Sequence, residues 1–234
     1  MNYITLNGKK SLLIKGLLIS ELPPITKPLI RTKVEEIDGR DGDIITKLGY
    51  AAYDKKMSIG LFGDFNIDDI IEYFDSEGTV IFSNEPDKFY RYQILNQIDF
   101  ERLIRFRTAT VVFHVQPFKH SSVDDTVTFD NLSGSSGSIS SRNNGNVIAR
   151  PEVTVYGSGA VTLSLNGKMI GISISTDGYI TLNGETMNAY KGDTLKNRSI
   201  TGNLKYLYLP VGRWVIPWTG SVSKIVVKDG SRWI

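Results

Sequence analysis

The sequence predicts a mainly β protein of two domains, with one α-helix in the first domain. Three observations support this fold class. Short runs that alternate apolar and polar residues recur between Asn-Gly and Asp-Gly turn signals along most of the chain. A helical repeat of apolar residues stands out at one place only. A stretch rich in Ser, Gly and Asn, residues 131–150, divides the chain near its middle.

Residues 131–150 mark the expected domain boundary. Their short side chains bury little surface and offset little of the entropy lost on ordering, which is typical of a linker; a long hairpin loop inside one domain is the alternative. All ten Phe precede this stretch and all three Trp follow residue 130, while the net charge changes from −4 over 1–130 to +6 over 131–234. We therefore expect a first domain over 1–132, a linker or loop over 133–150 and a second domain over 151–234.

The composition excludes several classes of protein. A hydrophobic share of 41% and a charged share of 22% are globular values, and a net charge of +2 is too small to indicate a nucleic-acid binder. The absence of Cys removes disulfides, thiolate metal sites and Cys nucleophiles. The most apolar early run, Leu12–Ile19, is far shorter than the ~20 residues of a membrane-spanning helix, and no cleavage site follows it. We expect synthesis in a cytoplasm without secretion by the general route.

The first domain is expected to open with a β-hairpin. Tyr3–Leu6 alternates, Asn7-Gly8 supplies the two positive φ angles of a type I′ turn, and a second strand should run through Leu12–Ile14. We interpret the run Leu12–Ile19 as a pair of core strands. Three prolines, Pro23, Pro24 and Pro28, cannot donate ladder hydrogen bonds and predict an extended edge segment.

A hairpin tip is expected next. Lys33–Ile37 is predicted to be a strand that runs into Asp38–Asp43, where two Asp/Gly turn signals indicate an exposed tip or loop. Asp38, Asp41 and Asp43 are also candidate calcium ligands, because Ca²⁺ prefers carboxylate oxygens. The twelfth position from Asp38 is Gly49, whereas an EF-hand loop requires Glu there, so plain Asx-type turns are favoured.

The single predicted helix spans Asn66–Glu77. Asn66 suits the N-cap, four apolar residues from Ile67 to Phe74 fall on one stripe, and Gly78 suits a left-handed stop. Strands are expected at Thr79–Ser83, Phe89–Ile98 and Phe106–Val115, the last with one apolar face and an end at Pro117. His114 and His120, the only histidines, lack a partner at metal-ligand spacing, so an ordinary strand residue is the favoured interpretation of His114.

The second domain is expected to be β throughout. Short strands recur at a spacing of about 8–12 residues, which indicates a β-sandwich or jelly roll. Asn166-Gly167 and Asn183-Gly184 are expected to make hairpins, and Thr176-Asp177-Gly178 a turn.

Two activities of the second domain remain open. Trp214, Trp218 and Trp233 are candidate contacts for a glycan, as in a carbohydrate-binding module, although packing of Trp214 and Trp218 in the core is favoured. A glycosidase would need two carboxylates ~5–9 Å apart. The available acids, most of them in or near turn signals, are Glu152, Asp177, Glu185, Asp193 and Asp229.

Several stretches, in order and spacing, resemble the distal tail proteins of bacteriophages with long non-contractile tails. These stretches are residues 37–43 with a Gly-Arg-Asp-Gly turn, 89–92, 111–118, 144–167 and 220–225. The resemblance implies a first domain of mixed β-sheet with one helix, a sandwich or split barrel that forms a hexameric ring, and a galectin-like β-sandwich as the second domain. It implies a structural virion protein at the tail tip, with no catalytic residues, cofactor or metal.

In this family the ring joins the tail tube to the tail tip, leaves a channel for DNA and anchors tip or receptor-binding proteins. The partners implied are further copies of the chain, a tail tube protein, and tail-tip, tail-associated lysin or receptor-binding proteins. Sequence-specific nucleic-acid binding and membrane binding are not expected, and weak carbohydrate binding remains open. Because a ring can close sheet edges by pairing with a neighbour, the candidate ring contacts are Pro23, Pro24, Asp38, Arg40 and Asp41.

Overall fold

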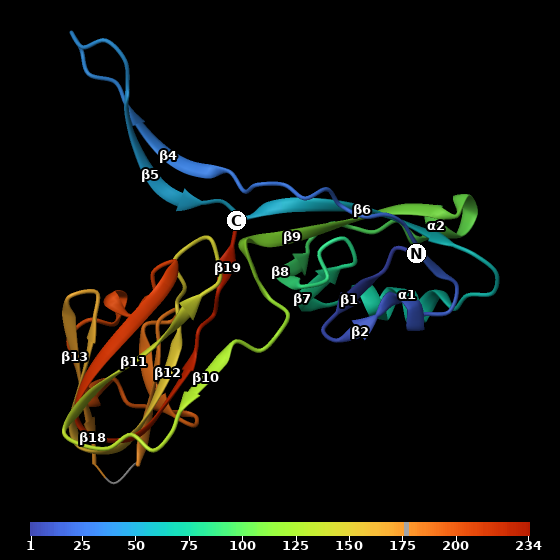
Figure 1. Ribbon diagram of the computed structural model, residues 1–234. Helices are drawn as coiled ribbons and strands as arrows, with labels where there is room; N and C mark the ends of the chain where they lie inside the picture. The colour runs from blue at the N-terminus through green and yellow to red at the C-terminus, as the bar shows by residue number, and fades with distance from the viewer. Residues whose placement is uncertain (176–177) are drawn as a thin grey trace. The chain divides into compact units, whose positions relative to one another are not determined.

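The computed structural model describes residues 1–175 and 178–234 and divides the chain into two compact units (Figure 1). The first unit comprises Met1–Ser122 together with Ile234, and the second comprises Val123–Trp233. Each unit has its own cluster of buried hydrophobic residues, as expected of a domain. The division falls between Ser122 and Val123, ahead of the predicted linker.

The first unit is built mainly of strands, with two short α-helices and one 3₁₀ turn among its described residues. Its helices are α1 (Ile67–Phe74) and α2 (Phe100–Phe106), and the 3₁₀ turn η1 spans Ser11–Leu13. Its strands are β1 (Ile4–Leu6), β2 (Lys9–Lys10), β3 (Leu17–Glu21), β4 (Ile30–Glu35), β5 (Ile44–Tyr50), β6 (Tyr53–Leu61), β7 (Glu77–Phe82), β8 (Lys88–Ile94) and β9 (Thr108–Ser121).

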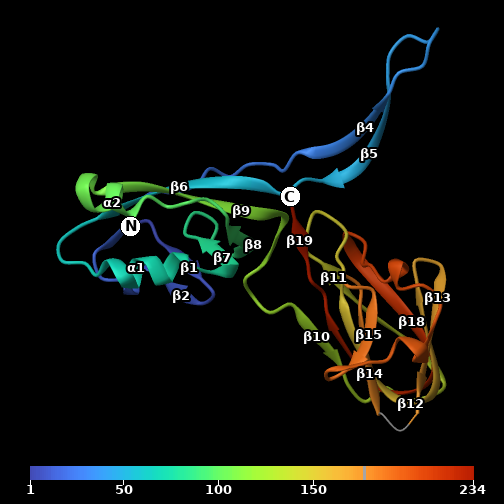
Figure 2. The same cartoon turned by 180° about the vertical axis from the view of Figure 1, so that it is seen from behind.

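One sheet organises this unit, with strand order β2-β1-β7-β8-β9-β6-β3 (Figures 1 and 2). Each of these neighbouring pairs is antiparallel, so the parallel pairs of a mixed sheet do not occur among these seven strands. Alternate residues of β9, from Ala109 to Val115, are buried, as the predicted apolar face requires. Helix α1 buries Ile70, Tyr73 and Phe74 in the same core.

The opening hairpin forms, but its second strand is shorter than predicted. Asn7 and Gly8 have φ angles of 48° and 87°, as a type I′ turn requires. Strand β2 ends at Lys10, and Leu12 and Leu13 lie exposed in η1 instead of in a core strand. Periodicity misassigned them because two adjacent leucines fit a strand and a short helical turn equally well.

The helix prediction was right for α1 and missed α2. Asn66 caps α1 by accepting a hydrogen bond from the Asp68 amide, but the helix ends at Phe74 and Gly78 lies in β7, not at a helix stop. Helix α2 begins after Asp99, whose carboxylate accepts from the Arg102 amide at 2.8 Å. Strand β9 starts later than predicted and continues through Pro117 to Ser121.

The second unit is almost entirely β, with two 3₁₀ turns, η2 (Asn197–Ser199) and η3 (Leu204–Tyr206), among its described residues. Its strands are β10 (Thr126–Phe129), β11 (Ser136–Asn143), β12 (Glu152–Leu165), β13 (Lys168–Ile174), β14 (Tyr179–Asn183), β15 (Asn188–Lys191), β16 (Thr194–Leu195), β17 (Ile200–Thr201), β18 (Gly212–Lys228) and β19 (Arg232–Trp233). The predicted turn at Thr176-Asp177 lies outside the described residues.

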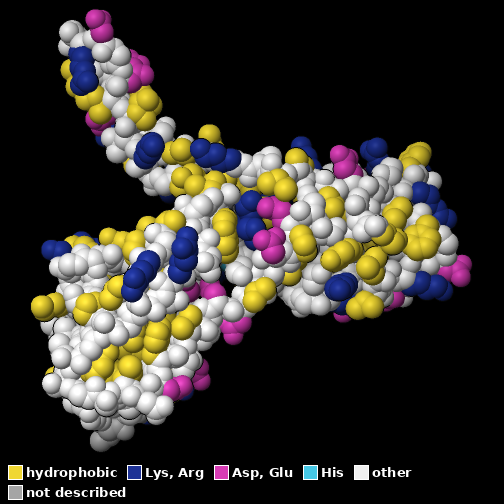
Figure 3. Space-filling view, in the orientation of Figure 1, with side chains coloured by type: hydrophobic (Ala, Val, Ile, Leu, Met, Phe, Trp, Pro, Cys, Tyr) yellow, Lys and Arg dark blue, Asp and Glu magenta, His cyan; other side chains and the backbone are white. Residues whose placement is uncertain are grey.

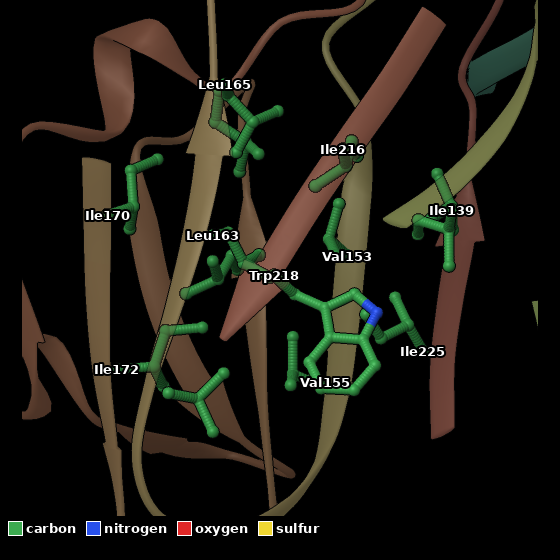
Figure 4. Packing of buried hydrophobic residues seen from close by; sticks show 14 of the residues in the cluster. Ile139, Val153, Val155, Leu163, Leu165, Ile170, Ile172, Ile216, Trp218 and Ile225 are labelled. Carbon is green, nitrogen blue, oxygen red and sulfur yellow. The ribbon is translucent and has the colours of Figure 1, made fainter. Parts of the chain in front are cut away.

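Two long strands, β12 and β18, build the core of this unit. The first half of β12 pairs with β14 and its second half with β13, and its pairing with β18 shifts register between Tyr156 and Gly157 and between Ser158 and Thr162. Such shifts bend a strand so that it can serve two layers of a sandwich. Figure 4 shows the resulting core, where Trp218 lies among aliphatic side chains such as Val155, Ile216 and Ile225.

The predicted linker is the clearest error in the sequence interpretation. Ser136–Asn143 forms β11 and pairs with β18 in an unbroken antiparallel register from Ser136↔Thr219 to Asn143↔Gly212. The small side chains of β11 contribute little burial of their own. The tryptophans of β18 supply it instead, since Trp214 and Trp218 lie opposite Ser141 and Gly137 in the register and are themselves buried.

Candidate functional site

The first unit carries a largely exposed hairpin that we call the arm, residues 30–50. Its strands β4 and β5 pair only with each other among the described residues, from Ile30↔Tyr50 to Glu35↔Ile44, and form a two-stranded sheet separate from the main one (Figure 1). The predicted tip is confirmed as an exposed loop that holds Asp38, Arg40 and Asp41.

The arm exposes apolar side chains that an isolated ribbon would not be expected to carry. Val34, Ile45 and Leu48 are 51%, 62% and 57% exposed. A lone two-stranded hairpin is marginally stable in water, and full burial of such a side chain is worth about 1.5–3 kcal/mol. The arm therefore leaves apolar side chains in contact with water without a core of its own to bury them.

The proline-rich segment that leads into the arm is fastened to the main sheet. Pro23 is buried, and its carbonyl accepts a hydrogen bond from the Asn84 side-chain amide at 3.1 Å. The Pro24 carbonyl accepts from the Lys55 ammonium at 2.7 Å. Pro24 itself is exposed, so of the two predicted ring-contact prolines only Pro24 presents its ring to solvent.

A buried polar network lies behind this segment. The Lys119 ammonium donates to Glu85 Oε1 at 2.8 Å, and the Tyr90 hydroxyl donates to Glu85 Oε2 at 2.6 Å. Lys55 lies over the Tyr90 ring, 5.0 Å from its centroid. Burial lowers the pKa of Lys55 to about 8, against the opposing effect of Glu85, and burial together with the Glu85 hydrogen bond raises the pKa of Tyr90.

Sequence reasoning missed this network, although one signal was present. Lys55 is in phase with Met57, Ile59 and Leu61 along β6, and all four are buried. A lysine at an inward position of a strand predicts a buried anion or carbonyl partner. Nothing in the local pattern identifies that partner, because Glu85 is separated from Lys55 by helix α1 and strand β7.

The histidines and acidic residues do not gather into a reactive centre within the described residues. His114 Nδ1 lies 2.8 Å from Asp54 Oδ1 across the β6–β9 pair, and the His120 ring stacks on Phe89. Outside residues 176–177, no group of three or more His, Asp or Glu side chains could hold a metal ion. The helices that the structure describes include none long and apolar enough to cross a membrane.

The tryptophans of the second unit are mainly structural. Trp214 and Trp218 are only 2% and 3% exposed and belong to the core, so they present no face on which a sugar could stack. The packing alternative is therefore the better account of both, and Trp233 alone is partly exposed.

A second buried carboxylate lies beside Trp214. Burial, with a contribution from Asp125, raises the pKa of Asp229 to about 6, while Ser231 and Trp214 act in the opposite direction. The Ser231 hydroxyl donates to Asp229 Oδ2 at 3.3 Å, whereas Oδ1 is buried without a hydrogen bond. Because burial disfavours the charged carboxylate, Asp229 is a destabilising element of the second unit at neutral pH.

The observed boundary also changes the charge balance. Asp124, Asp125 and Asp130 fall in the second unit, so residues 1–122 carry 16 basic and 17 acidic residues and residues 123–234 carry 11 and 8. The net charges are then −1 and +3 instead of −4 and +6. The charge contrast between the two units is therefore much weaker than a division at residue 130 suggests.

The described residues form two mainly β units, one of which carries an exposed apolar arm. No protein-family model and no curated protein matches the sequence. Several solved structures are similar to the chain, and two that match nearly its full length are described below.

The crystal structure of Dit from phage SPP1, a hub adsorption apparatus protein of phages that infect Gram-positive bacteria, is 19% identical with a TM-score of 0.63 over 100% of both chains. A chain of the phage p2 baseplate in its activated conformation is 10% identical, with a TM-score of 0.50 over 96% of this chain and 97% of that one. The chain thus has the fold of phage Dit hub and baseplate proteins, and the resemblance expected from the sequence is confirmed at the level of fold.

Proposed function

We propose that this chain is a structural hub protein at the distal end of a phage or prophage tail. In this proposal its first unit forms a hexameric ring that joins the tail tube to the tail tip, and the ring anchors tip or receptor-binding proteins. The observation that carries the proposal is the fold shared with SPP1 Dit over the whole of both chains, which includes both units. Virion localisation, and synthesis in the host cytoplasm, follow from the same proposal.

The arm supports the ring. A ring requires two different surfaces that fit each other, one on each side of every copy. The arm supplies one such surface, since Val34, Ile45 and Leu48 are exposed on a hairpin whose outer edges pair with no other strand that the structure describes. An edge strand of this kind is stabilised when a neighbouring copy covers it. Pro24, Asp38, Arg40 and Asp41 are exposed beside or at the end of this surface and stay predicted ring contacts.

The mass in solution tests the proposal. Light scattering on a size-exclusion column should give six times the 26.1 kDa of the chain, about 157 kDa. A stable dimer or trimer would contradict the hexamer. A monomer would call for the same measurement after mixing with the tail tube protein of the same phage, and a monomer in both would refute the ring.

Localisation in the virion has a separate test. Antibodies against the second unit should label the distal end of intact tails in electron micrographs. Label along the tail shaft, or none on purified virions, would contradict a hub at the tip.

A further inference from the structure

One edge of the second unit's sheet is open along β11. Strand β11 pairs with β18 through all eight of its residues, and no strand in residues 1–175 or 178–234 pairs with its other side. Natural edge strands are usually protected by Pro, Lys, bulges or very short length. Strand β11 has no Pro, no Lys and no register shift.

The backbone groups on that open side can be assigned from the ladder. The Gly220 amide donates to the Ser135 carbonyl, so the 135/220 position is a hydrogen-bonded pair. Such pairs alternate along an antiparallel ladder. Odd residues of β11 therefore bond to β18, and the amides and carbonyls of Ser136, Ser138, Ser140 and Arg142 face away from it. These four residues are exposed, and three of them are serines that leave the backbone accessible.

A buried donor without a partner lies beneath the same edge. The Trp218 indole extends under β11 so closely that a Cβ on Gly137 would lie 2.8 Å from Cζ2 and 3.1 Å from Nε1. Trp218 is 3% exposed and its Nε1 is buried with no hydrogen-bond partner in the structure. Figure 4 shows this nitrogen on the side of the ring nearer Ile139 of β11. A buried N–H without an acceptor costs about 1–3 kcal/mol.

Two arginines define the charge of the partner. Arg142 and Arg213 are directly opposite each other in the β11–β18 register, and both side chains are exposed. Like charges in this position repel and destabilise the pair. Neither guanidinium has an ion-pair partner among the residues that the structure describes. Basic side chains and a strip of hydrophobic ones lie over β11 and β18 in the space-filling view (Figure 3).

We propose that the open edge of β11 is a docking site for an extended, acidic segment of another protein, which adds to the sheet as an antiparallel or parallel strand. Its backbone would pair with Ser136, Ser138 and Ser140, and a carboxylate would bridge Arg142 and Arg213. A native segment with a polar side chain at an inward position would in addition give Trp218 Nε1 an acceptor, which the valine–glutamate probe used below does not supply. Main-chain pairing gives such sites their affinity and side chains their specificity. All residues of the site belong to the second unit, so the proposal does not depend on whether the first unit forms a ring.

The test uses the full chain and a synthetic peptide that alternates valine and glutamate as the probe. Hydrogen exchange followed by NMR should show slower exchange of the outward amides of β11 when the peptide is added, with a change in tryptophan emission. Two further peptides isolate the cause. The same sequence with N-methylated backbone amides keeps the charge but cannot form a ladder, and a valine–lysine peptide keeps the ladder but reverses the charge.

Matched variants complete the test. Ser138→Pro with Ser140→Pro removes two outward amides and leaves the bonds to β18 in place, whereas Ser138→Ala with Ser140→Ala keeps every backbone group. We expect binding to be lost in the first and unchanged in the second, and to weaken about tenfold in Arg142→Gln with Arg213→Gln, the equivalent of about 1.4 kcal/mol.

Three outcomes would overturn the proposal. One is equal binding of the N-methylated peptide to the unaltered chain, which does not depend on any variant folding. The second is no protection of β11 amides by the acidic peptide at any soluble concentration. The third is self-association of the chain through the same amides, which would assign the edge to a second copy instead.

Discussion

Lys119 and Glu85 form an ion pair in which Nζ lies 2.8 Å from Oε1 and both side chains are at least nine-tenths buried. The Tyr90 hydroxyl satisfies the second carboxylate oxygen at 2.6 Å. Each of these charges is costly to remove from water, and the attraction between them offsets that cost only while both are present. The pair joins the turn before β8 to the far end of β9, so it fixes two long segments of the first unit.

Breaking this pair should therefore be costly. We expect Lys119→Met to lower the free energy of unfolding of the first unit by about 3–5 kcal/mol, because it leaves the Glu85 carboxylate buried with Tyr90 and a more distant Lys55. Far-UV circular dichroism in urea measures the change. The exposed Glu101–Arg105 pair of α2 supplies the control, since Glu101→Gln should cost less than about 0.5 kcal/mol there. If the two substitutions lowered the free energy of unfolding equally, the buried ion pair would contribute no more to stability than an exposed one.

Lys55 should give the first unit an unusual pH dependence. Its pKa is lowered from 10.5 to about 8 in the folded chain, chiefly by burial. Between these pH values the unfolded chain holds a proton that the folded chain has released, so this group's contribution to stability rises with pH. The rise amounts to at most about 3–4 kcal/mol, at 1.36 kcal/mol for each of the roughly 2.5 pH units between these values.

The measurement compares the unaltered chain with Lys55→Met. The difference in stability between the two should shift in favour of the unaltered chain as the pH rises through about 8. Below that pH the difference should be flat. A difference that does not change between neutral pH and about 9.5 would show that Lys55 titrates normally.

An element could be predicted from the sequence when its own side chains form the buried face, and could not when residues far along the chain supply the buried surface. Strand β9 and helix α1 were found because their own residues alternate or repeat with the period of the element, as Val111, Phe113 and Val115 do. Strand β11 was predicted as a linker because its burial is supplied by Trp214 and Trp218 of β18, more than 70 residues away. The composition around β11 therefore contains no information about these tryptophans.

Of the three Asn-Gly pairs that were predicted to make hairpins, two form two-residue turns and the third does not. Asn166 and Gly167 have φ angles of 52° and 72° and join β12 to β13 tightly. Asn183 instead accepts hydrogen bonds from the amides of Glu185 and Thr186 and starts a longer loop. The same dipeptide serves both turns because an Asn side chain can replace a backbone acceptor.

The candidate site was predictable only in part. Local turn chemistry was sufficient to identify the exposed tip at Asp38–Asp43. The sugar-binding role of Trp214 and Trp218 was not supported, because both occupy the buried positions of β18, where buried and exposed residues alternate. The buried network around Glu85 and the open edge of β11 depend on long-range pairing, which a single sequence does not encode locally.

Asp229 should destabilise the second unit at neutral pH. Its pKa is raised from 3.8 to about 6, so the folded chain keeps a proton that the unfolded chain loses in that window, and stability falls as the pH rises from about 4 to 6. Asp229→Asn keeps the shape and removes the buried charge. We expect the variant to be more stable by about 1–3 kcal/mol at pH 7 and equal to the unaltered chain below about pH 4.

Tryptophan fluorescence is the natural readout for this prediction, since Trp214, Trp218 and Trp233 all lie in the second unit and report its unfolding alone. Asp130→Asn, at an exposed carboxylate that pairs with Lys224, provides the control. A variant that is less stable than the unaltered chain at pH 7 would mean that Asp229 makes a favourable interaction as an anion.

The arm should be required for assembly and dispensable for folding. Val34→Thr with Ile45→Thr keeps two β-branched residues and removes apolar surface that is more than half exposed. If a neighbouring copy covers these side chains, their loss should cost several kcal/mol at each contact and convert the 157 kDa species of about six copies into monomers at micromolar concentration. Circular dichroism should be unchanged, because the arm contributes little to either core.

Leu12→Thr with Leu13→Thr is the matched control, since these leucines are also exposed but lie in η1, away from the arm. Loss of the assembly in the control but not in the arm variant would place the contact at the β1–β2 end of the sheet and remove the arm from the ring.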